Sequence, residues 1–260
     1  MLKTQPNQVR GPVGESVARL DGQEKVTGAA QFADDIQFGP GLLHARILRS
    51  PHPHALIKRI DATKALALPG VRAVVTGEQT PGYIGLYLQD RHIFCRDRVR
   101  YIGDPVGQYE VANFIFPKPG TNISNHFKIR RGDVAGAWAE CASIVEREYR
   151  VPHIQHVPIE PHVAVARWDE KGKITLWASS QSPFAQRNLI AKALHLSQSQ
   201  IQVIAPYVGG GFGAKAGVSM EALAVVIAGA VKGRPVKLRL TREEEFFTTF
   251  VRQGLVARFK

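Results

Sequence analysis

One stretch constrains this chain more than any other: a glycine loop between an apolar strand and an apolar helix. Residues 209–213 read GGGFG, with a strand predicted over 201–208 before them and a helix predicted over 219–233 after them. Glycine has no Cβ, so its backbone can approach a ligand closely and adopt conformations that other residues avoid. The loop is therefore either a ligand-binding cradle or a tight turn, and the positive end of the following helix would add to an anion site.

Strands and helices alternate along the rest of the chain. The first hundred residues predict strands over 42–50, 55–61 and 71–77 and a short helix over 62–70. Glycines and prolines within 99–122 indicate a domain boundary there. The second part predicts a helix over 134–142, a strand containing Ile144, Val145 and Tyr149, a strand over 173–180, a helix over 183–196 and a last strand over 234–241. This alternation predicts an α/β (α+β) fold.

The charge of the chain points to anionic ligands without choosing among them. There are 34 Lys and Arg residues against 22 Asp and Glu, a formal net charge of +12. Such a surface attracts nucleic acid, phosphorylated cofactors, acidic partner subunits or anionic membranes. The sequence has no helix-turn-helix signature, zinc-finger spacing or long basic run, which argues against nucleic acid. The segment around the glycine loop contains one acidic residue, Glu221, and six basic residues, so we expect a buried anion there. The basic residues are Lys215, Lys232, Arg234, Lys237, Arg239 and Arg242.

The cysteines and the N-terminal segment suggest a cytoplasmic protein. Cys95 and Cys141 form no CxxC pair, which excludes a self-contained Fe–S or cysteine–zinc site on this sequence and suits a reducing compartment. Residues 1–13 lack an apolar signal core and a twin-arginine pair, and are expected to be flexible. The hydrophobic fraction of 44% is that of an ordinary globular protein, so no membrane span is expected.

Two side chains carry a further chemical signal. Gln181 lies between a strand and a helix that starts with proline, so it is either a polar group at a ligand site or a helix cap shared with Ser180 and Ser182. Phe212, among glycines, must lie against either a planar ligand or the core. The loop is not a Walker loop, and it fits GxGxxG only if Ala214 replaces the last glycine.

The histidines and the acidic residues give weaker signals. Neither of the two histidine groups has the spacing of a metal site, so we expect their side chains to form hydrogen bonds with loop backbone. The groups are His44, His52 and His54, and His153, His156 and His162. Asp34, Asp35 and the acidic run at 243–245 are expected to be solvated or to start a helix. The lack of a GxSxG motif argues against a serine hydrolase.

Seven motifs follow one another along the chain: RLDGQEKVTGAAQFADDI (19–36), RSPHPHALIKRID (49–61), VRYIGDPV (99–106), IEPHVAVARW (159–168), WASSQSPFAQR (177–187), VGGGFGAK (208–215) and RPVKLRLTREEEF (234–246). In this order they resemble the molybdenum-binding subunit of the xanthine dehydrogenase and aldehyde oxidase family, the molybdenum hydroxylases. The resemblance implies an α/β hammerhead domain over 14–115, followed by the first part of a molybdopterin-binding domain over 116–260.

The resemblance also implies chemistry, cofactor and partners. Family members hydroxylate aldehydes or N-heterocycles with oxygen from water, and electrons pass through Fe–S clusters to FAD, usually on partner subunits. Their cofactor is a molybdenum–pyranopterin, in its plain or cytosine dinucleotide form. The family's glutamine near the molybdenum oxo ligand corresponds to Gln181, and its cofactor-binding loop corresponds to Gly210, Gly211, Phe212 and Gly213, with Phe212 also near the metal.

Three departures from the family pattern shape the expected function. A stretch that normally follows GDPV is absent, so the hammerhead domain is expected to be shortened. The chain ends at Lys260, so the second molybdenum domain with the general-base glutamate is expected outside it, for example on a separate chain, and this chain alone is expected to be inactive. Ala216 stands where purine-oxidising members have a substrate-binding glutamate, which argues against xanthine.

Three hypotheses remain open on the sequence. The first is a molybdopterin-binding subunit, or fragment, of a molybdenum hydroxylase. The second is a truncated, non-catalytic relative that serves as an assembly piece. The third is a nucleotide-binding protein that uses the glycine loop. Molybdenum and pterin in the purified complex would favour the first hypothesis over the other two.

Overall fold

The computed structural model describes the chain except for residues 1–13, 15, 81, 86–88, 106–127 and 130. The chain divides into two compact units, Met1–Gln31 and Phe32–Lys260. The predicted flexible segment 1–13 and the predicted boundary near residue 115 lie outside the described residues. In the first unit, helix α1 (Gly22–Thr27) ends at Gly28, whose left-handed backbone (φ 76°) stops the helix.

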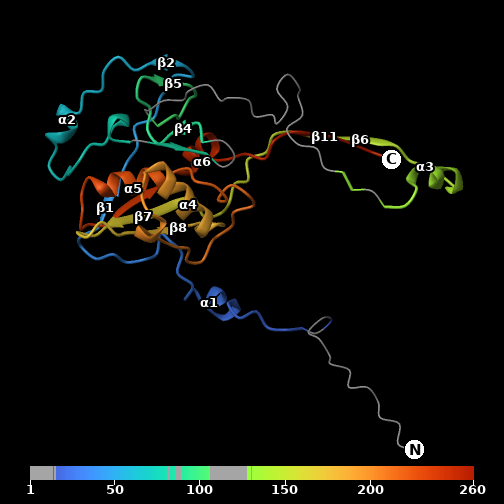
Figure 1. Cartoon of the computed structure of the whole chain (residues 1–260). Coiled ribbons are helices and arrows are strands. Elements are labelled where there is room, and N and C mark those ends of the chain that lie inside the picture. Colours follow the sequence, from blue (N-terminus) through green and yellow to red (C-terminus); the bar gives the residue numbers. More distant parts are fainter. Residues whose placement is uncertain (1–13, 15, 81, 86–88, 106–127, 130) are drawn as a thin grey trace, which may run out of the picture. The chain divides into compact units, whose positions relative to one another are not determined.

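A five-stranded mixed sheet organises the second unit (Figure 1). Its strands lie in the order β1 (Leu43–Ala45), β10 (Val236–Arg239), β7 (Val163–Trp168), β8 (Ile174–Ala178) and β9 (Ile201–Ile204). β1 pairs parallel with β10 and β8 pairs parallel with β9, whereas β7 runs antiparallel to both of its neighbours. Strands from both halves of the sequence share this sheet, and the predicted α/β (α+β) class is confirmed.

Two helices cover the sheet with apolar side chains. α5 (Glu221–Gly229) packs on β7, β8 and β10, and α4 (Pro183–Ala193) packs beside β9. Pro183 starts α4, where its missing N–H costs no helical hydrogen bond. The core that these elements share is made of aliphatic residues, among them Ile174, Leu176, Ile190, Leu223, Val236 and Leu238.

Shorter elements complete the second unit. Two-stranded ladders pair β2 (Ala55–Leu56) with β5 (Arg98–Val99), β3 (Tyr83–Ile84) with β4 (Arg91–His92), and β6 (Arg147–Val151) with β11 (Leu255–Phe259). The helical segments are α2 (Thr63–Leu66), α3 (Val134–Ala137), α6 (Arg242–Thr248) and the 3-10 turns η1 (Gly77–Gln79), η2 (Trp138–Glu140) and η3 (Gln198–Gln200). A reciprocal capping box between Thr241 and Glu244 starts α6. None of the helices in the described ranges is long and apolar enough to cross a membrane.

Four features of the local structure differ from the predictions. Residues 71–76 form no strand; together with β1 they line an apolar cavity of about 480 Å³. β7 lies in the middle of the sheet but has no counterpart among the predicted strands, because prolines crowd the segment before it. Ile144 and Val145 are exposed and precede β6, and the helix predicted over 134–142 is split into α3 and η2.

Leu176→Ala tests whether the five-stranded sheet is the folding core. The Leu176 side chain is fully buried in β8, so its truncation is expected to lower the free energy of unfolding by about 2–5 kcal/mol. Leu66→Ala, on the exposed side of helix α2, is the matched control and is expected to change it by about 0.5 kcal/mol or less. Urea unfolding followed by circular dichroism measures both variants, and equal losses would contradict the assignment.

Candidate functional site

The topology brings Gln181 and the glycine loop to one edge of the sheet. Gln181 follows the end of β8, residues 209–213 follow the end of β9, and these two strands run parallel. β7 runs in the opposite direction, so residues 159–162 enter it at the same edge. The carboxyl ends of parallel strands are where α/β proteins commonly form ligand sites. Three segments that are separate in the sequence therefore meet at a favourable place.

The loop holds the side-chain amide of Gln181 in one orientation. Its Oε1 accepts the backbone N–H of Gly213 at 2.9 Å and that of Lys215 at 3.2 Å. Both partners are donors, so the atom that faces them must be the amide oxygen. The Nε2 group then remains without a partner among the described residues, on an exposed side chain. Gln181 is not a helix cap, because Ser182 is the N-cap of α4 and its hydroxyl donates to the carbonyl of Ala216.

The loop backbone forms a cradle that requires glycine at particular positions. A Cβ on Gly211 would lie 2.4 Å from Gln181 Oε1, so any side chain there would displace the Gln181 amide from the loop. Gly213 has a φ of +106°, a conformation that residues with side chains rarely adopt. The N–H groups of Gly210, Gly211 and Phe212 donate to no atom in the described part of the chain. The loop thus offers backbone donors to a ligand.

Phe212 lies at an exposed turn of this loop. Its side chain is 72% exposed, so the core alternative is wrong for this residue. Its backbone has a φ of +55°, and its ring lies close to the backbone of Gly210. The N–H of Ala214 donates to the carbonyl of Gly211 at 2.9 Å and closes the turn. The loop therefore forms a tight turn and also presents backbone N–H donors to a ligand.

A buried ion pair fixes both ends of the loop. Lys215 Nζ is fully buried and donates to Glu160 Oε2 and to the Glu160 carbonyl, both at 2.8 Å. The same Oε2 accepts the N–H of Gly209 at 2.8 Å. A buried charge is tolerated only with such a partner. Lys215 is therefore neutralised within the protein, and the expectation that it awaits a buried anion is wrong.

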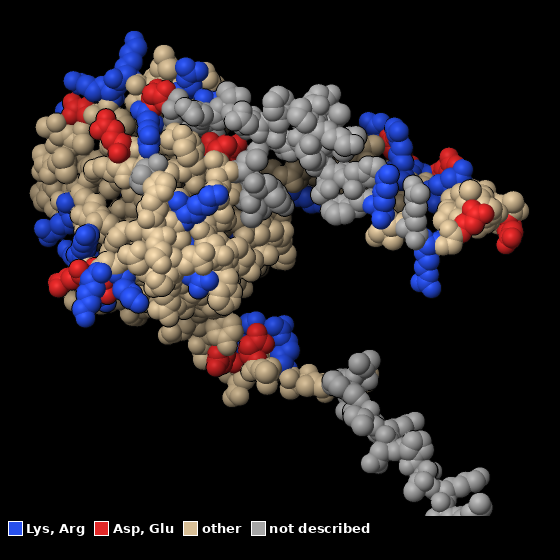
Figure 2. Space-filling model, viewed as in Figure 1, with Lys and Arg blue, Asp and Glu red and all other residues tan. Residues whose placement is uncertain are grey.

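The other basic residues near the loop in sequence are spread around the sheet. Arg234, before the start of β10, donates to the carbonyl of Gly41, whereas Lys237 and Arg239 pair with Asp34. Figure 2 likewise shows Lys and Arg side chains spread over the face in view, with no single patch. Asp34 is thus ion-paired, contrary to the prediction that it is solvated, and Lys237, Arg239 and Arg242 line one cavity with it rather than the glycine loop.

A second buried pair, His162 with Glu245, holds the loop through its backbone. His162 Nε2 lies 3.1 Å from the carbonyl of Ala214, which can only accept, so this nitrogen carries a hydrogen. His162 Nδ1 lies 2.9 and 3.0 Å from the two carboxylate oxygens of Glu245. The prediction that histidines bond loop backbone is confirmed for His162 and for His156, whose Nδ1 lies 3.2 Å from Phe250 O. The acidic run at 243–245 lies in the first turn of α6, which confirms the predicted helix start, although Glu245 is fully buried and not solvated.

The pKa of Glu245 reflects its surroundings. Burial alone would raise the pKa of this carboxyl, but the hydrogen bonds from His162 and the positive charges of His162 and Lys215 outweigh burial. Together they hold the pKa of Glu245 below its ordinary value of 4.5. Glu245 and Glu160 are absent from the residues predicted for the site, because their partners lie 83 and 55 positions away in the sequence.

The start of helix α5 is occupied by a carboxylate of its own. Glu221, buried in the first turn, accepts the N–H of Ser219 at 2.8 Å and the side-chain amide of Gln186 at 3.1 Å. A carboxylate at this position offsets the positive end of the helix dipole. The expected contribution of this helix to an anion site at the loop is therefore wrong.

The site as a whole offers hydrogen-bond donors to a ligand. They are the Nε2 group of Gln181 and the N–H groups of residues 210–212. The two carboxylates that hold the loop, Glu160 and Glu245, are both ion-paired. The arrangement suits an oxygen-rich or anionic ligand, and both carboxylates contact cations of the protein, while Glu160 Oε1 is buried without a hydrogen-bond partner among the described residues.

Family comparisons match most of the chain. Residues 115–260 match the molybdopterin cofactor-binding domain, and residues 27–112 match the family described as aldehyde oxidase and xanthine dehydrogenase, a/b hammerhead domain. The nicotinate dehydrogenase large molybdopterin subunit of Eubacterium barkeri is 31% identical, over 89% of this chain and 62% of its own length. The xanthine dehydrogenase of Dictyostelium discoideum is 27% identical, over 99% of this chain and 21% of its own length.

The fold is also similar to that of solved molybdenum enzymes. The aldehyde oxidoreductase from Desulfovibrio gigas superposes with a TM-score of 0.71 at 26% identity, over 92% of this chain and 31% of that chain. A Cu,Mo-CO dehydrogenase superposes with the same TM-score and identity, over 94% of this chain and 38% of that chain. The chain therefore spans less than two thirds of the length of these similar proteins.

Glu245→Gln is expected to remove a pH-dependent part of the stability. Because the folded-state pKa of Glu245 is depressed, its carboxylate contributes stability that is fully present above the ordinary pKa of 4.5 and is lost as the pH falls through the folded-state value. The free energy of unfolding of the wild type should therefore fall more steeply with acidification below pH 4.5 than that of the variant.

Urea unfolding at a series of pH values measures these slopes. Glu243→Gln, on the exposed side of α6, is the matched control and should keep the wild-type slope. An identical slope for the wild type and Glu245→Gln would show that the buried pair contributes nothing to the acid response.

Proposed function

Because this chain belongs to the xanthine dehydrogenase and aldehyde oxidase family of molybdenum hydroxylases, we propose that its glycine loop and Gln181 hold a molybdenum–pyranopterin cofactor. The observation that carries the proposal is the contact of Gln181 Oε1 with the loop, which leaves the Nε2 donor free. We assign Gln181 and Phe212 to the surroundings of the metal, and Gly210, Gly211 and Gly213 to contacts with the cofactor.

The residues present fit such a group. The oxygens of a metal oxo ligand and of a phosphate are hydrogen-bond acceptors, and this site presents amide donors from Gln181 and from residues 210–212. The exposed ring of Phe212 offers an apolar face to a planar ring system. The absence of a Cβ on Gly211 keeps the donors of the loop and of Gln181 close together. These features support the plain and the cytosine dinucleotide forms of the cofactor alike.

The proposed reaction is hydroxylation of an aldehyde or an N-heterocycle by water. A substrate C–H bond becomes C–OH with oxygen from water, and two protons and two electrons are released. When bound, the cofactor supplies the metal centre that accepts the two electrons before they leave through Fe–S and FAD partner subunits. Gln181 donates from Nε2 to an oxygen atom of the bound cofactor and so positions it. The buried Glu160–Lys215 pair keeps the loop in place.

An aldehyde or a nicotinate-like N-heterocycle is a better proposed substrate than xanthine. The resemblance places Ala216 where purine-oxidising members have a glutamate, and a methyl group accepts no hydrogen bond from a purine. The relative from Eubacterium barkeri is named a nicotinate dehydrogenase, which supports an N-heterocycle.

We assign the general base to a part of the enzyme outside this chain's loop site. Glu160 and Glu245 each hold the loop through an ion pair with another residue of the protein, so we assign neither of them as the base. The similar proteins are longer than this chain, which leaves room for a second molybdenum domain with a catalytic glutamate, on further sequence or on a separate chain. This chain alone is then inactive, and the complete complex works in the cytoplasm.

Gly211→Ala tests the cradle by cofactor content. The chain is co-expressed with its neighbouring genes, and molybdenum and pterin in the purified complex are measured by mass spectrometry. The wild-type complex should carry both, and Gly211→Ala should lose most of them, because the new Cβ would lie 2.4 Å from Gln181 Oε1. Gly41→Ala, whose Cβ would meet no atom within 4 Å, is the matched control and should keep the wild-type content. An assembled wild-type complex without either component would support a non-catalytic assembly piece instead.

Gln181→Ala and Phe212→Ala test the roles of the two residues in the loaded complex. Removing a positioned donor typically lowers kcat by about 10²-fold or more, so dye-coupled turnover by Gln181→Ala should fall by roughly that factor. Phe212→Ala should lower it by roughly fivefold, because about 1 kcal/mol of ring contact is lost. Gln202→Ala, exposed on β9, is the control and should match the wild type. Wild-type rates in both site variants would remove the assignment.

A further inference from the structure

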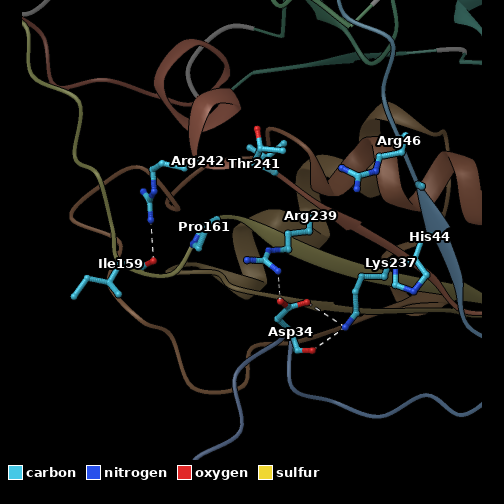
Figure 3. Close-up of a pocket in the computed structure, with 11 residues that line it drawn as sticks. Asp34, His44, Arg46, Ile159, Pro161, Lys237, Arg239, Thr241 and Arg242 are labelled. Atoms are coloured by element: carbon cyan, nitrogen blue, oxygen red, sulfur yellow. Dashed lines mark hydrogen bonds and ion pairs between the residues drawn. The ribbon is translucent and has the colours of Figure 1, made fainter.

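A second cavity lies at the same edge of the sheet, next to residues 159–161. It has a volume of about 680 Å³ and is bounded by residues at the ends of β1 and β10 (Figure 3). Ile159 and Pro161 line it, whereas Glu160 between them pairs with Lys215. No residue of the glycine loop lines this cavity. It is therefore a site of its own.

The cavity has only one carboxylate among several cations. Asp34 contacts two of these cations, with Lys237 Nζ at 3.2 Å from Oδ1 and Arg239 Nη1 at 2.9 Å from Oδ2, as Figure 3 shows. Arg46 and Arg242 line the same cavity and have no carboxylate partner among the described residues. One negative charge cannot neutralise four positive ones, so the cavity attracts anions.

Two of the cations have hydrogen-bonding capacity to spare. Arg242 donates from Nη2 to the carbonyl of Ile159 at 2.8 Å, but its buried Nη1 has no hydrogen-bond partner among the described residues. A buried polar atom without a partner is rare in proteins, and a bound ligand is one way to satisfy it. Arg46 directly follows β1 and lines the cavity. It forms no hydrogen bond or ion pair with a described residue. Both guanidinium groups are therefore available to an anion.

We propose that this cavity binds a small phosphorylated molecule through its phosphate group. Guanidinium groups match phosphate oxygens in geometry and charge, and three arginines line the cavity. A volume of this size is typical of sites for small organic ligands and exceeds what a phosphate group fills. Ala45, Ile159, Pro161 and Leu240 supply an apolar wall for the remainder of the molecule. The inference is independent of the proposed function, because different residues carry it and its test needs no molybdenum.

Isothermal titration calorimetry of the full chain with inorganic diphosphate at low ionic strength tests the proposal. The wild type should bind saturably, and Arg46→Gln should bind at least about fivefold more weakly because a charge-assisted contact is lost. Arg46 is exposed and forms no hydrogen bond or ion pair with a described residue, so its replacement is expected to leave the fold intact, which circular dichroism of the variant checks. Arg167→Gln, exposed on β7 and outside the cavity, is the matched control and should bind like the wild type. Should Arg46→Gln fail to fold, Arg239→Gln takes its place.

A parallel titration with adenosine diphosphate distinguishes two sources of the phosphate. Tighter binding of adenosine diphosphate than of diphosphate supports an organic ligand on the apolar wall, and equal binding supports a site for the phosphate group itself. Absence of saturable binding to the wild type, or equal weakening in Arg46→Gln and Arg167→Gln, would overturn the proposal. Binding of a polyglutamate peptide without any binding of diphosphate would overturn it as well.

Discussion

The buried ion pair between Glu160 and Lys215 is the interaction on which the candidate site depends. It joins the segment that enters β7 to both ends of the glycine loop, because Glu160 also exchanges hydrogen bonds with Gly209. Removing one member would leave a buried charge without a partner, which typically costs about 3–5 kcal/mol. The loop conformation is therefore specified by a polar network, since its glycines have no side chains to bury and Phe212 is exposed.

The same network decides which groups face a ligand. Gln181 uses its oxygen on the loop and keeps its Nε2 donor free, and His162 uses both ring nitrogens on Ala214 and Glu245. Most polar groups inside the site are thus engaged by the protein, with Glu160 Oε1 a buried atom that has no hydrogen-bond partner among the described residues, whereas the donors of Gln181 and residues 210–212 are left open. The network of hydrogen bonds and ion pairs holds the loop, and the donors that face a ligand are unoccupied. The binding groups are therefore in place before the ligand arrives, as tight binding requires.

The sequence predicts the local parts of this site and misses its long-range contacts. Glycine spacing and motif order single out Gln181 and residues 209–213, and the structure brings these together. The acidic run at 243–245 gives no local sign that Glu245 turns inward, because its partner His162 is 83 positions away. The net charge of +12 likewise cannot say where the charges lie: Lys215 is buried, while Lys237 and Arg239 share Asp34. These burial and ion-pair outcomes depend on contacts between residues that are far apart in the sequence. Such contacts leave no periodic pattern in the sequence.

Both candidate sites touch the segment that leads into β7, so a ligand in one has a physical connection to the other. Ile159 and Pro161 line the basic cavity, and Glu160 holds the glycine loop. Energetic coupling between two sites requires an element with two arrangements that the ligands prefer differently. The Glu160–Lys215 pair opposes a second arrangement, because a shift of the segment would separate two buried charges. We therefore expect an anion in the cavity to act on the loop through its charge rather than through a change in the shape of the loop.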